Sequence, residues 1–93
     1  MTPDLRASLR SVTIEVGLKG AVTLVVADHD TAIALRSGSV PVLATPEMIS
    51  MIEYCCIDAT KDYMDEGETS VGAHVCVSHE KPTYVDEEYV VSC

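Results

Sequence analysis

Hydrophobic residues recur at every second position in several short segments of this chain. The clearest is "AVTLVVADHD" (residues 21–30), which is rich in valine and ends in turn-forming aspartates, so it predicts a strand. We expect two further short extended segments, one in residues 11–20 and one in residues 31–39. These patterns place extended chain through most of the first 40 residues.

Two more strands are expected in the C-terminal third. In "TSVGAHVCVSH" (residues 69–79), alternate positions share one face of a strand, and His79 falls in register at the end of that face. The apolar members of the face are Val71, Ala73, Val75 and Val77. A final strand is expected to begin within residues 83–93.

Between these groups of strands, the apolar residues follow a helical period. Thr45 is a good N-cap, Pro46 suits the first helical position, and Glu47 complements the helix dipole. One stripe holds Met48, Ile49, Met51, Ile52, Cys55, Cys56, Ala59 and Tyr63, and the opposite side holds Glu47, Ser50, Tyr54 and Lys61. Glu53 falls on the flank of the apolar stripe, and we expect the helix to end near Gly67.

The order of these elements predicts an α+β domain in which one long helix packs on an antiparallel sheet. A length of 93 residues allows one domain, residues 1–93. We expect residues 1–15 to form a loose N-terminal segment.

The charge balance excludes several classes of function. Six basic residues stand against fifteen acidic ones, which gives a net charge of -9. Binding to nucleic acid or to an anionic membrane surface requires clustered positive charge, so we expect neither partner. The N-terminus lacks the apolar core of a signal peptide, and no apolar run reaches membrane-spanning length, so we expect a cytoplasmic protein.

The cysteines and histidines show no metal-binding or redox spacing. In a cytoplasmic protein the four cysteines are expected to be thiols, and we interpret them as small core residues. A metal site built from His29, His74 and the acidic residues is disfavoured because their spacing matches no compact ligand set. We therefore expect neither a metal nor a cofactor.

Three polar residues occupy positions where apolar residues would be easier to place. They are Thr45, Glu53 and His79, and they converge if the strand at residues 69–79 packs across the helix. A hydroxyl, a carboxylate and an imidazole together can activate a nucleophile for attack on an acyl group. Each also has a structural explanation, since Thr45 can cap the helix, Glu53 can be solvated, and His79 can bond to backbone.

Three stretches of the sequence resemble one known family. "GLKGAVTLVV", "TAIALRSGSVPVLATPEMISMIE" and "EGETSVGAHVCVSH" look like the hotdog-fold thioesterases of the fluoroacetyl-CoA thioesterase-like family. The resemblance covers roughly residues 16–85. Its most specific combination is "VLATP", a glutamate eight residues past the threonine, and "TSVG" followed by a histidine.

The resemblance implies an acyl-CoA thioesterase whose catalytic set is Thr45, Glu53 and His79. It assigns Glu53 the role of nucleophile or general base, His79 that of assisting proton transfer, and Thr45 that of orienting the thioester or Glu53. A glycine beside the acyl group matches Gly72. Hotdog domains generally pair, so the resemblance also implies a homodimer with residues 69–79 at its interface.

Two departures from the family shape these expectations. The fluoroacetyl-specific member has a phenylalanine shortly before the threonine, whereas this chain has Ser39 there and no phenylalanine at all. The expected substrate is therefore a short-chain acyl-CoA or a similar thioester. Family members also continue for several strands beyond residue 93, so we expect a hotdog fold with its C-terminal strands missing. The alternative function is a non-catalytic or truncated module that binds acyl groups or a partner chain.

Overall fold

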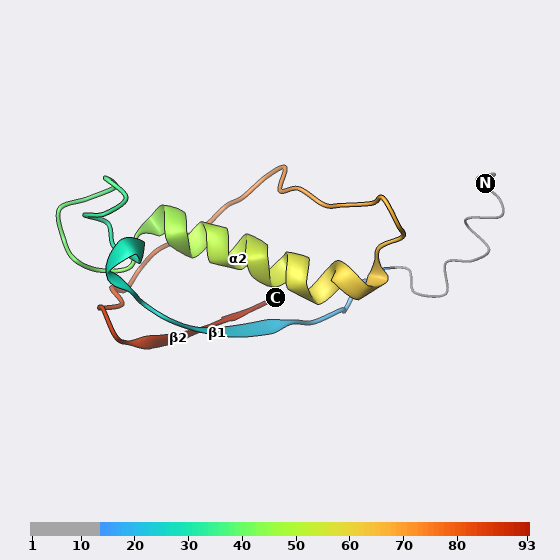
Figure 1. Cartoon of the computed structure of the whole chain (residues 1–93), viewed down its shortest axis with the longest axis horizontal. Helices are drawn as coiled ribbons and strands as arrows, with labels where there is room; N and C mark the ends of the chain where they lie inside the picture. The colour runs from blue at the N-terminus through green and yellow to red at the C-terminus, as the bar shows by residue number, and fades with distance from the viewer. Residues whose placement is uncertain (1–13) are drawn as a thin grey trace.

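The computed structural model describes residues 14–93. Its elements are β1 (Ala21–Val25), the 3-10 turn η1 (Asp28–Asp30), the helix α2 (Thr45–Thr60), the 3-10 turn η2 (Lys61–Tyr63) and β2 (Glu88–Ser92). The helix lies along the two strands, and the chain that follows it returns along the helix on the side away from the sheet before entering β2 (Figure 1). The α+β prediction of one long helix on an antiparallel sheet is confirmed.

The two strands form an antiparallel pair in which Ala21 faces Ser92 and Val25 faces Glu88. Backbone hydrogen bonds extend the pairing past both ends of the ladder. At one end Gly20 and Cys93 exchange two bonds of 2.9 Å, and at the other the N–H of Val26 donates to the carbonyl of Glu87 at 3.0 Å. The expected strands in residues 21–30 and 83–93 are therefore present, and they pair with each other.

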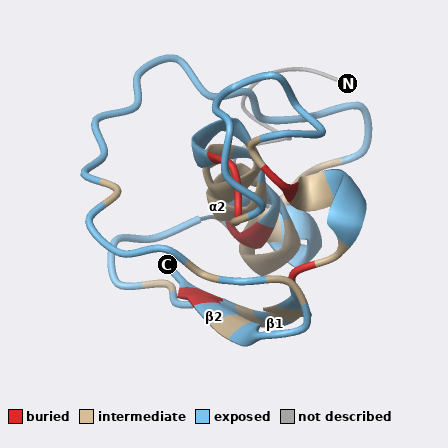
Figure 2. Ribbon diagram, turned by 90° about the vertical axis from the view of Figure 1, so that its left-hand side faces the viewer, coloured by how far each residue is buried: buried red, intermediate tan, exposed pale blue. Residues whose placement is uncertain are grey.

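The core is small, and its buried residues come from the strand pair, from the helix and from the chain that leads into the helix (Figure 2). Its largest fully buried side chains are Val26, which directly follows β1, and Cys55, which lies in α2. Leu43, Ala44 and Val91 complete the buried apolar set, and Thr31 is the buried polar residue among those the structure describes. A core of this size fits the limited burial available to a short chain.

Gly20 allows the sheet to approach the helix closely. A Cβ added at Gly20 would lie 2.5 Å from the Cβ of Ala59 and 3.3 Å from the Sγ of Cys93. Real Cβ atoms essentially never approach another heavy atom this closely, so a larger residue would push the strand end away from α2.

The helix boundaries differ from those expected. Ala44 is the N-cap, so Thr45 is the first helical residue, and no side chain caps the helix. The helix ends at Thr60 and tightens into η2, whereas Gly67 lies in a later turn with φ of +82°. The Thr60 hydroxyl donates to the carbonyl of Cys56 at 2.8 Å, a back-bonding pattern that competes with helix continuation.

Three expected strands are wrong. Residues 31–39 form turns because the N–H of Leu35 donates to the carbonyl of Thr31 at 3.0 Å, which curls the chain. Residues 69–79 run without strand pairing, because no strand lies beside them in the part of the chain that the structure describes. In the segment 11–20, residues 14–20 contain a turn with Gly17 at φ of +99°, and residues 11–13 lie outside the described residues.

The expected loose segment, residues 1–15, lies almost wholly outside the described residues. Among residues 14–93, no helix has the length and apolar character needed to cross a membrane.

Candidate functional site

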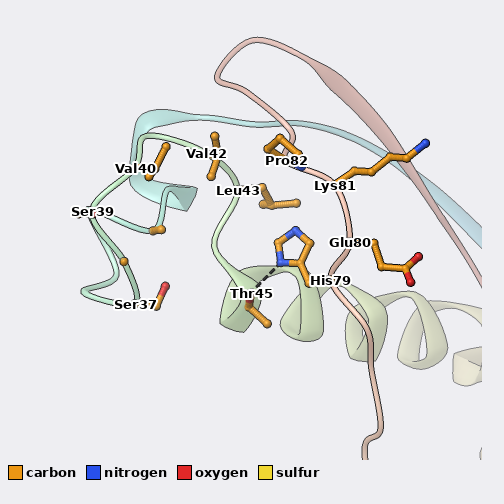
Figure 3. A pocket seen from close by; sticks show the side chains of 12 residues that line it. Ser37, Ser39, Val40, Val42, Leu43, Thr45, His79, Glu80, Lys81 and Pro82 are labelled. Atoms are coloured by element: carbon orange, nitrogen blue, oxygen red, sulfur yellow. Dashed lines mark hydrogen bonds between the residues drawn. The ribbon is translucent and has the colours of Figure 1, made fainter.

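Thr45 and His79 meet at the start of α2. The Thr45 Oγ1 and the His79 Nδ1 lie 2.7 Å apart and share a hydrogen bond whose direction depends on the imidazole tautomer (Figure 3). Thr45 is exposed and His79 is half-buried. Because Ala44 takes the capping position, the Thr45 hydroxyl engages the imidazole and not the helix backbone.

Backbone pairing explains how two residues 34 positions apart come together. The N–H of Leu43 donates to the carbonyl of Thr83 at 2.8 Å, and Val42 bridges to Tyr84 in antiparallel fashion. These contacts fasten the chain just before α2 to the chain just after His79. The pair is therefore positioned by residues that neighbour it in sequence and are themselves tied to the core through the buried Leu43.

The Thr45–His79 pair lines a cavity of about 300 Å³. Its wall combines the turn before the helix with the chain after His79, and consists of Ala32, Ser37, Gly38, Ser39, Val40, Val42, Leu43, Thr45, His79, Glu80, Lys81 and Pro82. The Lys81 side chain extends away from the pair, towards solvent (Figure 3). The cavity is thus a small recess with one hydrogen-bonded polar pair at its side.

Glu53 and Gly72 form a second close contact farther along the helix. Glu53 is half-buried, and a Cβ added at Gly72 would collide with the Glu53 Oε2 and lie 3.3 Å from its carboxyl carbon. Only a residue without a side chain lets the backbone approach the carboxylate this closely. Gly72 thereby places peptide backbone directly beside the charged group.

The Glu53–Gly72 contact borders a larger, mostly apolar cavity of about 820 Å³. Its wall is formed by one face of α2 and by residues 70–77, and consists of Ile14, Ile52, Glu53, Cys56, Ile57, Thr60, Met64, Ser70, Val71, Gly72, His74, Val75, Cys76 and Val77. A carboxylate at the edge of an apolar recess is an arrangement typical of a small-molecule binding site.

The structure therefore brings the four candidate residues together in two pairs. Glu53 follows Thr45 by eight residues, which is about 12 Å of helix rise. Within residues 14–93, no hydrogen bond joins Glu53 to Thr45 or His79. The hydroxyl, imidazole and carboxylate thus lie along α2, with the Thr45–His79 pair at the start of the helix and the Glu53 carboxylate about two turns later.

Sequence reasoning missed several residues of the smaller cavity. Ser37 and Gly38 were not among the expected site residues, and Ser39 was noted only for its match to the family's phenylalanine. The structure folds this turn against Thr45 and His79. Pairing of residues 42–43 with 83–84 creates the recess, and no local pattern predicts pairing over such a distance.

An acidic cluster near the helix start also escaped prediction. Burial first, and then the carboxylate of Asp30, raise the pKa of Glu47, although the helical pattern placed Glu47 on the solvent side. Burial together with the nearby Asp30 and Glu47 also raises the pKa of Tyr89. Among the described residues, no group of three His, Cys, Asp or Glu side chains is arranged to hold a metal ion.

A long helix packed on an antiparallel sheet is one feature of the hotdog fold, and comparison with solved structures shows the relationship. The chain matches the solved structure of the fluoroacetyl-CoA thioesterase FlK with a TM-score of 0.79 and 28% identity, over 85% of this chain and 63% of that one. A single-site variant of FlK in complex with acetyl-CoA matches with the same TM-score and 28% identity, over 85% and 64% of the two chains. A second variant, in complex with fluoroacetate and CoA, matches at 30% identity and a TM-score of 0.77, over 85% and 68%.

The family model described as fluoroacetyl-CoA-specific thioesterase matches residues 26–93, so the chain belongs to this family. It is also 38% identical over 42 residues to the fluoroacetyl-CoA thioesterase of Streptantibioticus cattleyicolor. The matched segment covers 45% of this chain and 30% of that protein. The chain therefore spans less than a third of the curated relative and about two thirds of the solved structures.

Proposed function

We propose that this chain carries the catalytic residues of an acyl-CoA thioesterase. The observation that carries the proposal is the Thr45–His79 hydrogen bond beside a recess, on the same helix edge as a carboxylate held against Gly72. Membership of the thioesterase family supports the same chemistry.

In this mechanism Glu53 acts on the acyl carbon and His79 acts on the leaving sulfur. Glu53 either attacks the carbonyl carbon itself or removes a proton from an attacking water, so that a carbon–oxygen bond forms as the carbon–sulfur bond breaks. His79 delivers the proton that the departing CoA thiolate takes up. The long side chain of Glu53 shortens the gap along the helix between the two pairs.

Thr45 and Gly72 position the reacting groups. The Thr45 hydroxyl fixes the orientation of the His79 ring through the 2.7 Å bond. Gly72 brings peptide backbone beside the carboxylate, and in this proposal a backbone N–H of that segment stabilises the negative charge that develops on the carbonyl oxygen.

The proposed substrate is a short-chain acyl-CoA. Ser39 lines the recess that contains Thr45 and His79, and it stands where the resemblance places a phenylalanine in the fluoroacetyl-specific member. A serine offers no bulky apolar surface to select a fluorinated group. The proposal is therefore hydrolysis of short acyl thioesters without selectivity for fluoroacetyl-CoA.

The test measures hydrolysis of a panel of short acyl-CoAs by loss of the thioester's ultraviolet absorbance, because the protein's own four thiols would react with a thiol reagent. It uses this chain and a version extended with the family's remaining strands. Glu53→Gln keeps the shape of the side chain and removes its charge, so kcat/KM should fall by ~10²–10⁴-fold, the usual worth of a general base. Glu88→Gln, an exposed carboxylate on β2, is the matched control and should leave the rate unchanged.

Two results would distinguish the thioesterase from the non-catalytic alternative and test the role of Glu53. If the extended version hydrolyses none of the thioesters, the alternative function, a non-catalytic module that binds acyl groups or a partner chain, replaces the enzyme. If hydrolysis occurs and Glu53→Gln leaves it unchanged, the enzyme stands and the role of Glu53 is wrong.

The proposal includes a cytoplasmic homodimer that pairs through residues 69–79. The exposed apolar side chains of this segment support the pairing, with Val71 87%, Val75 45% and Val77 41% exposed. Val71→Lys should shift the mass measured by light scattering towards the monomer, whereas Val16→Lys, at an exposed valine outside this segment, should not. A strictly monomeric wild type well above micromolar concentration would contradict the homodimer.

A further inference from the structure

Three of the four cysteines gather where the end of β2 meets the middle of α2. The Sγ atoms of Cys55 and Cys93 lie 3.1 Å apart, and the Cys55 thiol also approaches the carbonyl of Val91 at 3.5 Å. Cys56 is the third member, since partial desolvation and the nearby Cys93 thiol raise the pKa of its thiol. The expectation that all four cysteines are core residues is wrong, because only Cys55 is buried.

The two sulfurs closest to each other differ sharply in exposure. Cys55 is fully buried, whereas Cys93 is exposed. Both are anchored, because Cys55 lies inside α2 and the backbone of Cys93 exchanges two 2.9 Å hydrogen bonds with Gly20. A disulfide has an S–S length of about 2.05 Å, so the two sulfurs need to approach by only about 1 Å to form the bond.

We propose that Cys55 and Cys93 form a reversible disulfide that fastens the end of β2 to α2 when the protein meets a low-molecular-weight disulfide. The bond would join residues 38 positions apart in the chain, and would hold the helix two residues beyond Glu53. This inference rests on the thiol geometry and is independent of the proposed hydrolysis.

Exchange proceeds in two steps with oxidised glutathione as the oxidant. The exposed Cys93 thiolate attacks one sulfur of oxidised glutathione, which forms a mixed disulfide and releases one glutathione thiolate. The Cys55 thiolate then attacks the Cys93 sulfur, forms the internal disulfide and releases the second glutathione. The protein loses two thiol protons and two electrons, and oxidised glutathione becomes two molecules of the reduced form.

The second step should be slow at neutral pH. In the reduced protein the hydrogen bond with Cys93, followed by burial, raises the pKa of the Cys55 thiol to about 11. The first step consumes the Cys93 thiol, but Cys55 stays buried, and burial keeps the fraction of attacking thiolate low. Because the thiolate fraction rises about tenfold per pH unit below the pKa, ring closure should accelerate by roughly that factor from pH 7 to pH 8.

The experiment incubates the whole chain with oxidised glutathione, quenches with acid, and measures intact mass and disulfide-linked peptides. The expected product has lost two hydrogens, carries no glutathione, and yields a Cys55–Cys93 peptide. Cys93→Ser should prevent closure, and Cys55→Ala should stop at the mixed disulfide on Cys93. Cys76→Ser is the matched control, an exposed cysteine outside the thiol group, and should close like the wild type.

Several outcomes would overturn the proposal. They are a Cys56–Cys93 peptide in place of Cys55–Cys93, a stable glutathione adduct on the wild-type Cys93, and a disulfide between two chains on a non-reducing gel. A melting temperature measured on the oxidised wild type gives a second readout. It should rise relative to the reduced protein and should not rise in Cys93→Ser treated identically.

Discussion

Replacing Gly72 with alanine tests whether the position of the Glu53 carboxylate matters to the reaction. Gly72 is exposed and is not among the glycines with positive φ, so alanine meets no backbone penalty there. The added Cβ would collide with the Glu53 Oε2 and lie 3.3 Å from the carboxyl carbon. Since carbon and oxygen normally stay near 3.5 Å apart, the carboxylate must swing away by roughly 1 Å.

The expected cost falls on the rate and not on stability. A misplacement of about 1 Å in a reacting group can cost ~10²-fold, so kcat/KM of Gly72→Ala should fall by about that factor. That loss corresponds to about 2.7 kcal/mol of transition-state stabilisation. The free energy of unfolding should change by no more than about 0.5 kcal/mol, because a half-buried carboxylate can rotate towards water.

The assay compares thioester hydrolysis and melting temperature for the wild type, Gly72→Ala and the control Thr69→Ala, an exposed neighbour outside the cavity wall. Combining Gly72→Ala with Glu53→Gln adds a sharper test. If the glycine acts by placing the carboxylate, it should cost almost nothing once the carboxylate is gone. A full rate for Gly72→Ala, or a loss that persists undiminished in the Glu53→Gln background, would refute the reasoning.

Three further substitutions test other parts of the structure. Thr45→Val removes the hydroxyl that is hydrogen-bonded to His79, so kcat/KM should fall about tenfold. The melting temperature should drop by no more than about 5 °C, because an exposed hydrogen bond contributes little to stability. An unchanged rate would show that the bond is only structural. For Glu47, burial and Asp30 raise the pKa above its ordinary value of 4.5, so the folded protein holds this proton more tightly than the unfolded chain and loses stability as pH rises through the raised pKa. Glu47→Gln should therefore raise the melting temperature by roughly 2 °C at pH 7 and have little effect well below pH 4.5; an equal gain at both pH values would contradict the carboxylate's role. Gly20→Ala should lower the free energy of unfolding by about 1–3 kcal/mol, measured in urea, because its Cβ meets the helix; an unchanged midpoint would show that the strand end can move freely.

The parts of the fold that the sequence predicted correctly depend on local signals. The valines of β1 and the proline and apolar stripe of α2 lie within a few residues of the structure they determine. Residues 69–79 carry an equally clear alternating pattern, yet they form no strand, because a strand also needs a partner and none lies beside them among the described residues. Alternation therefore predicted which residues share a face, but not whether the ladder would form.

In the candidate site, too, the sequence predicted what local signals determine and missed what depends on distant parts of the chain. Thr45 stood out because of its place at the helix start, but its partner lies 34 residues away, and only pairing of the chain around Leu43 and Thr83 brings them together. The periodicity of α2 left Glu53 between the buried stripe and the solvent face, and the structure places it half-buried. The Cys55–Cys93 contact spans 38 residues and had no sequence signal at all.

Thr45, hydrogen-bonded to His79, is the first residue of α2, and the Glu53 carboxylate follows eight residues later in the same helix. The number of helical residues between them therefore determines how the two groups are placed relative to each other. Adding or deleting one residue between Thr45 and Glu53 would change their separation by only about 1.5 Å, but it would turn the carboxylate by about 100° around the helix axis. Glu53 would then face away from Gly72. The nine residues from Thr45 to Glu53 therefore set both the distance and the angle between these two groups. Natural variation there should consist of substitutions, with insertions and deletions confined to the flanking loops.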